Sequence, residues 1–244
     1  MHRLFLLLPI ATYRAEAFLE AARKLCVEVT LGLERTAVLL DRPQHDWLSL
    51  NFSEPARSVD AVVEYAREHP IHAVLGVDDN AAVLAAQIAE ALGLPHNSVE
   101  SVSAARNKYR MRELLREHGV RVPSFTRCSI FDPPEALAGK VSYPCVLKPL
   151  VLSASCGVIR ANDRKEFAEA FQRIAALLTT LGVTRSSEAG RQILIEDFIP
   201  GREVALEGLL TGGSLRVLAL FDKPDPLDGP YFEETIYVTP SRLP

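Results

Sequence analysis

A lysine at the end of an apolar run is the first feature of this sequence that could bind a ligand. The segment KPLVLSASCGV places Lys148 at the end of a predicted strand and follows it with small residues. A buried strand that ends on a charge costs free energy unless an anion meets it. Small residues let backbone N–H groups approach a ligand closely. These features predict a phosphate-binding loop containing Ser153, Ser155 and Gly157. A surface hairpin with a solvated lysine is the alternative.

A second cation, Lys108, lies in a predicted helix over residues 101–119, with Ser103 as its N-cap and Gly119 at its end. In such a helix Lys108 falls on the same face as the apolar residues, which is unusual for a solvated lysine. Convergence of Lys108 and Lys148 on one phosphate chain would explain both positions. A salt bridge or a solvated ammonium group is the alternative.

Carboxylates gather in the segment ILIEDFIPGREVALEGLL, residues 193–210. A strand period of two places Glu203 and Glu207 on one face, where they repel unless something separates them. Glu203 could accept hydrogen bonds from ribose hydroxyls. The edge of a base could meet Glu196 and the backbone of the residues that follow it, which are Asp197, Phe198 and Ile199. The alternative is the charged outer face of an antiparallel sheet.

Composition narrows the class of protein. The chain has 244 residues, 48% of them hydrophobic, and a formal net charge of -4. This balance is typical of a globular protein and argues against a general nucleic-acid binder. No apolar run is long enough to span a membrane. The four cysteines are widely spaced, without a zinc or disulfide pattern, so we expect a cytoplasmic protein.

The first hundred residues alternate strand and helix signals, which favours a parallel sheet with helices on its faces. The apolar run RLFLLL favours a buried first strand over a signal peptide. No G-x-G-x-x-G motif follows this strand, so a dinucleotide fingerprint is absent. The predicted strands cover residues 3–8, 27–33, 36–40 and 71–77, and the predicted helices cover residues 14–25, 56–69 and 80–93.

The rest of the chain predicts a different pattern. A long helix is expected to begin after Asp163, with Glu166 in its first turn, and to end near Leu181. Gly212 and Gly213 predict a hairpin turn between two antiparallel strands. The predicted strands cover residues 143–150, 157–161, 191–199, 203–210, 214–223 and 231–240.

The order of these motifs resembles the ATP-grasp superfamily. The blocks NKYRMRELLREHGVRVPSF, YPCVLKP with SASCGV, and IEDFIPGREV are similar to the helix and strand, phosphate loop and hinge of its nucleotide-binding lobe. The resemblance implies an α/β fold. A parallel pre-ATP-grasp domain over residues 1–98 would precede an α+β ATP-grasp domain over residues 99–244, which would lack its C-terminal portion.

The resemblance also implies roles for individual residues. Lys108 and Lys148 would contact the phosphates of ATP, beneath a flexible loop containing Ser153, Ser155 and Gly157. The adenine pocket would include Glu196, Asp197, Phe198 and Ile199, and Glu203 would hold the ribose. Residues expected near the acceptor substrate are Lys223, Glu233 and Glu234.

The cofactors implied are ATP and Mg²⁺ or Mn²⁺. The family binds the metal through an acidic residue and a later Glu-x-Asn-type pair, which does not occur before Pro244. We therefore expect the metal ligands beyond Pro244, and a truncated chain that could be inactive alone.

The implied function is an ATP-dependent ligase that joins a small-molecule carboxylate to an amine or thiol through an acyl phosphate. Catalytic residues are not assigned, and a homodimer is one expectation for its assembly. Two alternatives stay open. One is a biotin-carboxylase-like enzyme, in which ATP activates bicarbonate, and the other is a non-catalytic nucleotide-binding module.

Overall fold

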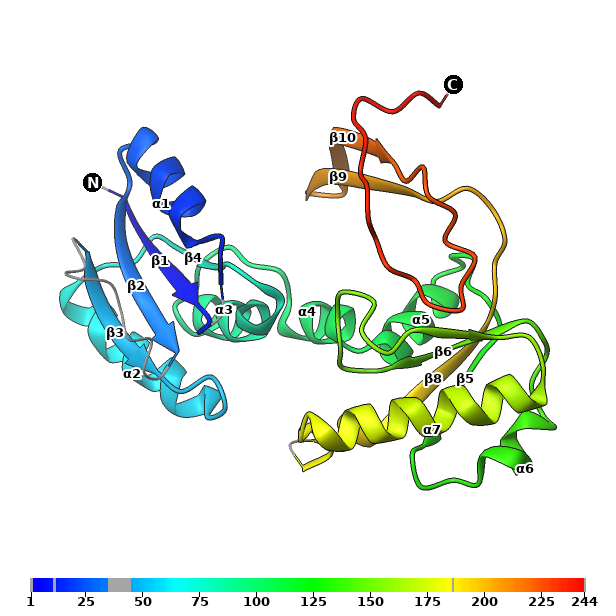
Figure 1. Ribbon diagram of the computed structural model, residues 1–244. Coiled ribbons are helices and arrows are strands. Elements are labelled where there is room, and N and C mark those ends of the chain that lie inside the picture. The colour runs from blue at the N-terminus through cyan, green and yellow to red at the C-terminus, as the bar shows by residue number, and fades with distance from the viewer. Residues whose placement is uncertain (1, 11, 35–44, 186, 244) are drawn as a thin grey trace. The chain divides into compact units, whose positions relative to one another are not determined.

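The computed structural model describes residues 2–10, 12–34, 45–185 and 187–243. It divides into two compact units, Met1–Arg106 and Asn107–Pro244 (Figure 1). The predicted domain boundary between residues 98 and 99 stays a prediction, because compactness alone does not delimit a domain. Each unit is described separately.

The first unit is built on a parallel sheet with strand order β3-β2-β1-β4. The strands are β1 (Arg3–Leu8), β2 (Glu28–Glu34), β3 (Asp46–Leu50) and β4 (Ala73–Gly76). The central strand β1 is buried on both faces: Phe5 and Leu7 belong to one apolar cluster, and Leu6 and Leu8 belong to another. A strand covered on both sides needs apolar residues at successive positions, which explains the run RLFLLL.

Four helices accompany this sheet: α1 (Ala15–Lys24), α2 (Pro55–Glu68), α3 (Asp79–Ala91) and α4 (Val99–Arg106). The predicted parallel sheet with helices on its faces is confirmed. The predicted strand over residues 36–40 lies outside the described residues. The sequence did not predict β3. This strand lies at the edge of the sheet and Leu50 is its one buried residue, so its apolar pattern is weak.

The second unit contains an antiparallel sheet with strand order β5-β8-β6-β7 and a separate hairpin, β9-β10. Its strands are β5 (Phe125–Ser129), β6 (Cys145–Pro149), β7 (Ile159–Ala161), β8 (Gln192–Asp197), β9 (Val204–Thr211) and β10 (Ser214–Asp222). Its α-helices are α5 (Lys108–Glu117), α6 (Pro134–Ala138) and α7 (Arg164–Thr180), and two short 3₁₀ turns cover Val183–Arg185 and Ala189–Arg191. The α/β class, with a parallel part followed by an antiparallel part, is therefore confirmed.

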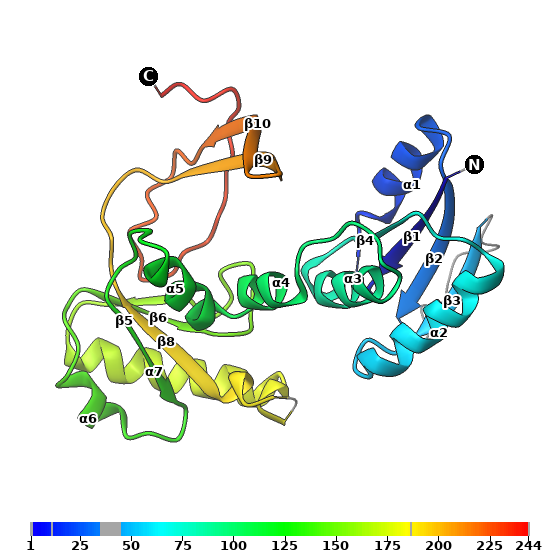
Figure 2. The same cartoon turned by 180° about the vertical axis from the view of Figure 1, so that it is seen from behind.

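Helix α7 covers one face of the antiparallel sheet, and α5 lies on the opposite side (Figures 1 and 2). As predicted, α7 begins after Asp163, whose carboxylate accepts a hydrogen bond from the backbone N–H of Glu166 at 2.9 Å. Its buried Phe167 and Phe171 pack against sheet residues such as Leu147. This apolar layer forms the core of the unit and leaves the other face of the sheet available for polar residues.

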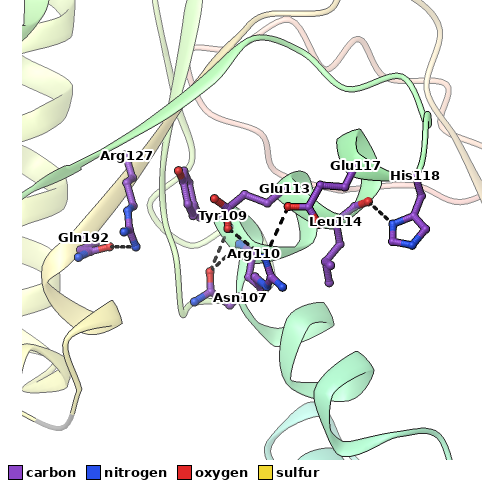
Figure 3. A network of polar contacts seen from close by, with 9 residues as sticks. All are labelled: Asn107, Tyr109, Arg110, Glu113, Leu114, Glu117, His118, Arg127 and Gln192. Atoms are coloured by element: carbon purple, nitrogen blue, oxygen red, sulfur yellow. Dashed lines mark hydrogen bonds and ion pairs between the residues drawn. The ribbon is translucent and has the colours of Figure 1, made fainter.

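The predicted single helix over residues 101–119 is wrong, because the chain forms two helices, α4 and α5, on either side of Asn107. Ser103 lies inside α4 and is not an N-cap. Asn107 has extended backbone angles, and its side chain accepts hydrogen bonds from the N–H groups of Tyr109 and Arg110 at 3.1 Å (Figure 3). An asparagine in this geometry begins a new helix, because it satisfies donors that the first turn leaves unpaired.

The C-terminal third also differs from the prediction. The hairpin through Gly212 and Gly213 is confirmed. Strand β8 pairs in antiparallel fashion with β5 and β6. The predicted strand over residues 231–240 is wrong. All of these residues are described, and they make only two isolated bridges, Tyr231 with Ile159 and Val238 with Asp222. The β-branched and aromatic residues of this segment therefore do not produce a strand.

The four cysteines are all free thiols. Cys128 and Cys145 are buried beneath α7, whereas Cys26 and Cys156 are exposed. Burial raises the pKa of the Cys145 thiol to about 11. Across the described ranges, no helix is both long enough and apolar enough to cross a membrane.

Candidate functional site

A cleft of about 510 Å³ opens in the second unit on the face of the sheet opposite α7. It is lined by α5, the segment between α5 and β5, β6 and the loop after it, the end of β8 and the segment after it, and the segment after β10. The charged residues that line it are Lys108, Arg112, Lys148, Glu196, Asp197, Arg202, Glu203 and Glu234. The uncharged ones are Pro123, Val146, Leu152, Ser153, Ala154, Ser155, Val158, Phe198, Ile199, Pro200, Gly201, Leu227 and Phe232.

A buried carboxylate, that of Glu196, organises the floor of the cleft. Its side chain is 5% exposed and forms ion pairs with Arg112 and Lys148. Arg112 donates from Nε to Oε2 at 3.0 Å and from Nη2 to Oε1 at 3.3 Å, while the ammonium group of Lys148 donates to Oε1. The arrangement is one anion held between two cations that both face the cleft.

Strand register brings these groups together. In the antiparallel pair of β6 and β8, Val146 lies opposite Glu196 and Lys148 lies opposite Leu194. Lys148 and Glu196 are therefore diagonal neighbours, within reach of each other's long side chains. Because side chains alternate between faces, Leu147 points into the core under α7 while Val146 and Lys148 point to the cleft.

The environment of Glu196 keeps it ionised. Burial by itself raises the pKa of a carboxyl group, because it disfavours the charged form. Here the attraction and hydrogen bonds of Lys148 and Arg112 outweigh burial, and the pKa of Glu196 lies below its ordinary value of 4.5. The floor of the cleft therefore carries a fixed ion cluster with a net positive charge at neutral pH.

Lys108 acts on the loop after β6. Its ammonium group donates hydrogen bonds to the carbonyl oxygens of Leu150, at 3.3 Å, and Leu152. It also lines the cleft, beside Lys148. The two lysines therefore face one cavity, and Lys108 additionally holds the base of the small-residue loop.

The small-residue loop, residues 151–158, has an unusual backbone. Ala154, Ser155 and Gly157 all have positive φ angles, of 53°, 54° and 76°. A Cβ at Gly157 would lie 2.9 Å from Cγ of Pro149, so a glycine is needed for both conformation and space. Such turns direct backbone N–H groups toward one side, which suits the binding of an anion.

At the other end of the cleft, Glu203 and Glu234 share one lysine. The ammonium group of Lys223 donates to both carboxylates, and its side chain is 8% exposed, compared with 50% for Glu203. The hydroxyl group of Tyr237 donates to Glu234 as well. Lys223 thus separates carboxylates that would otherwise repel each other, and Glu203 keeps one side open to the cleft.

The structure brings most of the predicted site residues into this cleft: Lys108, Lys148, Ser153, Ser155, Glu196, Asp197, Phe198, Ile199, Glu203 and Glu234. Gly157, Lys223 and Glu233 are outside the set of described residues that line it. Sequence reasoning missed Arg112, Arg202 and Phe232. Arg112 could have been found, because it lies four residues after Lys108 and so shares its helical face.

Within the described parts of the chain, no three His, Cys, Asp or Glu side chains are grouped so that they could hold a metal ion. Mg²⁺ is typically held by one or two carboxylates together with substrate phosphates and water. Carboxylates of the cleft would therefore hold such an ion only together with bound phosphates and water.

The fold and the cleft together define a class of protein, one with a parallel N-terminal unit followed by an antiparallel lobe that carries a cationic cleft. A family model described as the ATP-grasp domain matches residues 141–244, and one described as the ATP-grasp N-terminal domain matches residues 19–96. The chain belongs to the ATP-grasp superfamily, as the sequence motifs indicated.

Particular relatives share both sequence and fold. Alanine–anticapsin ligase of Bacillus subtilis (strain 168) is 24% identical over 210 residues, which are 81% of this chain and 44% of that protein. Dapdiamide A synthase of Enterobacter agglomerans is 28% identical over 158 residues, 64% of this chain and 36% of that one. The crystal structure of an L-amino acid ligase from Bacillus licheniformis has a TM-score of 0.81 and 28% identity, and the match covers 100% of this chain and 57% of that one. The chain thus spans about half the length of these relatives.

The ion cluster generates a prediction about stability. Replacement of Glu196 by glutamine leaves Lys148 and Arg112 close together without an anion, and should lower the free energy of unfolding by about 3 kcal/mol at neutral pH. Because the folded pKa of Glu196 is depressed, its ionisation stabilises the fold above pH 4.5, and this contribution is lost as the pH falls through the folded pKa. Urea unfolding at several pH values measures both effects.

The exposed Glu169→Gln on α7 is the matched control, since its partner is the exposed Lys165. We expect the wild type and this control to lose stability in parallel below pH 4.5, and Glu196→Gln to lose less. A cost for Glu196→Gln no greater than that of Glu169→Gln would contradict the importance of the cluster.

Proposed function

We propose that the cleft binds ATP and that the chain forms the nucleotide-binding part of an ATP-dependent ligase. The observation that carries the proposal is the convergence of Lys108, Arg112 and Lys148 beside the small-residue loop in one cavity. Cationic side chains and turn N–H groups on one side of a cleft match the charge and geometry of a polyphosphate. All three relatives described above are named as ligases or as a synthase, which supports the same assignment.

The phosphates would lie between Lys148 and the loop, where Ser153 and Ser155 line the cavity. The ammonium group of Lys148 has three donors, so it would donate a hydrogen bond to a phosphate oxygen as well as to Glu196. Arg112 would continue to neutralise Glu196 when the phosphate draws Lys148 toward it. The base would lie against Phe198 and Ile199, and the ribose near the open side of Glu203. In this arrangement the protein contributes position and charge, which are the main sources of catalysis in phosphoryl transfer.

The reaction we propose has two steps. A carboxylate oxygen of the first substrate attacks the γ-phosphorus of ATP, and ADP leaves, which gives an acyl phosphate. The uncharged amine of the second substrate attacks the acyl carbon, the bond from that carbon to the phosphate oxygen breaks, and inorganic phosphate leaves with the proton that the amine loses. Both steps need stabilisation of negative charge on phosphate oxygens, so no protein nucleophile is required.

The first test removes the cation at the end of β6. We expect Lys148→Ala to weaken ATP binding by at least about tenfold, because it removes a charged hydrogen-bond donor to phosphate. Titration calorimetry gives the affinity. The control is Lys165→Ala on α7, whose side chain is 85% exposed and which should bind ATP like the wild type. Unchanged affinity in a folded Lys148→Ala would refute the role of this lysine.

The second test concerns the ribose. We expect Glu203→Gln to weaken ATP by about fivefold, as for loss of a charged hydrogen bond, and to leave the affinity for 2′,3′-dideoxy-ATP nearly unchanged. Glu207→Gln is the control, because Glu207 lies on β9 four residues after Glu203 and is not among the described residues that line the cleft. Equal losses for both nucleotides would argue against a ribose contact.

The third test concerns the reaction. We expect ADP release from ATP to require an amino-acid carboxylate together with an amine, and not bicarbonate. A coupled assay for ADP, run with each substrate alone and in pairs, measures this dependence. Bicarbonate-dependent release would favour the carboxylase alternative. Tight ATP binding without turnover would favour a non-catalytic nucleotide-binding module if the protein assayed also carries the segment in which the metal ligands are expected.

A further inference from the structure

The chain after β10 returns to the antiparallel sheet and attaches to the short strand β7 (Figures 1 and 2). We call residues 227–232 the return segment. The backbone N–H of Arg160 donates to the carbonyl oxygen of Pro230 at 2.9 Å, and Ile159 forms an antiparallel bridge with Tyr231. Leu227 and Phe232, at the two ends of this segment, line the cleft. The return segment is therefore a wall of the cleft that depends on its attachment to β7.

The side chain of Arg160 makes this attachment specific. Its Nη1 donates to the carbonyl oxygen of Asp228 at 2.7 Å, and its Nε donates to Oδ1 of Asn162 at 3.0 Å. The guanidinium carbon also lies 4.1 Å from the ring centroid of Phe198. One side chain thus contacts both the return segment and the segment that follows β8.

Close approach of the backbone supports the same interpretation. Gly229 has a φ angle of 89°, and a Cβ at this position would lie 2.8 Å from Cβ of Arg160. The return segment can pass this close because a glycine faces the arginine. Two residues after Gly229, the ring of Tyr231 contacts α7. The guanidinium carbon of Arg173 lies 5.0 Å from the centroid of this ring.

The consequence for the cleft is the placement of two aromatic rings. Phe198 and Phe232 have centroids 6.5 Å apart and planes inclined by 35°, and both line the cavity. They come from different segments, so their spacing depends on what joins those segments. Flat aromatic side chains offer stacking surfaces to a nucleobase, whatever its hydrogen-bonding pattern.

We propose that Arg160 is a positioning residue that holds Phe232 beside Phe198, and that this aromatic pair binds the base of the nucleotide. The inference rests on the proposed function and deepens it. Arg160 acts through the return segment and need not touch the nucleotide. The phosphates are bound elsewhere in the cleft, so the contribution of Arg160 is specific to ligands that carry a base.

The test compares ATP with inorganic tripolyphosphate, which has no base, in calorimetric titrations of the 244-residue chain. We expect Arg160→Ala to weaken ATP by about tenfold, the range of one lost stacking contact, and to change tripolyphosphate affinity by less than about twofold. Phe232→Ala should have the same pattern. If Arg160 acts through Phe232, the double variant should be no weaker than Phe232→Ala.

Asp228→Ala is the matched control, because Arg160 uses the backbone carbonyl of Asp228 and not its side chain. It should bind both ligands like the wild type. Arg160→Lys keeps the positive charge but cannot donate to Asn162 and to the carbonyl of Asp228 at the same time as the guanidinium group does. This variant is used if Arg160→Ala does not fold. It should weaken ATP several-fold and spare tripolyphosphate.

Three results would overturn the inference: unchanged ATP affinity in the Arg160 variant, an equal loss for both ligands, or additive losses in the double variant. These results differ from failure of the proposed function. If the cleft does not bind nucleotides, the wild type binds neither ligand and Lys148→Ala changes nothing. If only the role of Arg160 is wrong, Lys148→Ala still weakens both ligands.

Discussion

The candidate site depends on one buried carboxylate being neutralised from two directions. Glu196 would be costly in this position alone, and a single partner would leave part of its charge uncompensated. Arg112 comes from α5 and Lys148 from β6, so the ion cluster ties a helix to two strands of the sheet. It also fixes where positive charge faces the cavity. The same contacts therefore stabilise the lobe and prepare it for an anionic ligand.

The antiparallel sheet divides two tasks between its faces. Leu147, Ile193 and Ile195 point toward α7 and supply the apolar core, which sets the position of the strands. Val146, Lys148 and Glu196 point the other way and form the floor of the cleft. The cleft walls come from less regular parts of the chain, the small-residue loop and the return segment. A rigid floor with walls held by a few specific contacts suits a site that must admit and release a large ligand.

Much of this arrangement could be predicted from sequence, because the signals were local. The apolar run of β1, the cap at Asp163 and the glycine pair of the hairpin each specify their own structure. The rest depended on distant contacts. Arg112 meets Glu196 across 84 positions of sequence, and helix periodicity alone did not show that Asn107 divides the helix. Residues 231–240 include β-branched and aromatic side chains that favour a strand, but no described strand pairs with them along their length, and pairing is what a strand requires.

The alternation of side chains along β6 has a consequence for how this region can vary in length. Leu147 and Lys148 are adjacent, yet one belongs to the core and the other to the cavity. One residue inserted within this strand would rotate the following side chains to the opposite face, burying an ammonium group under α7 and exposing a leucine to solvent. An insertion in an exposed loop has no such effect, because the side chains of a loop do not alternate between two faces. Between Cys145 and Pro149, by contrast, the spacing is as constrained as the residue types themselves.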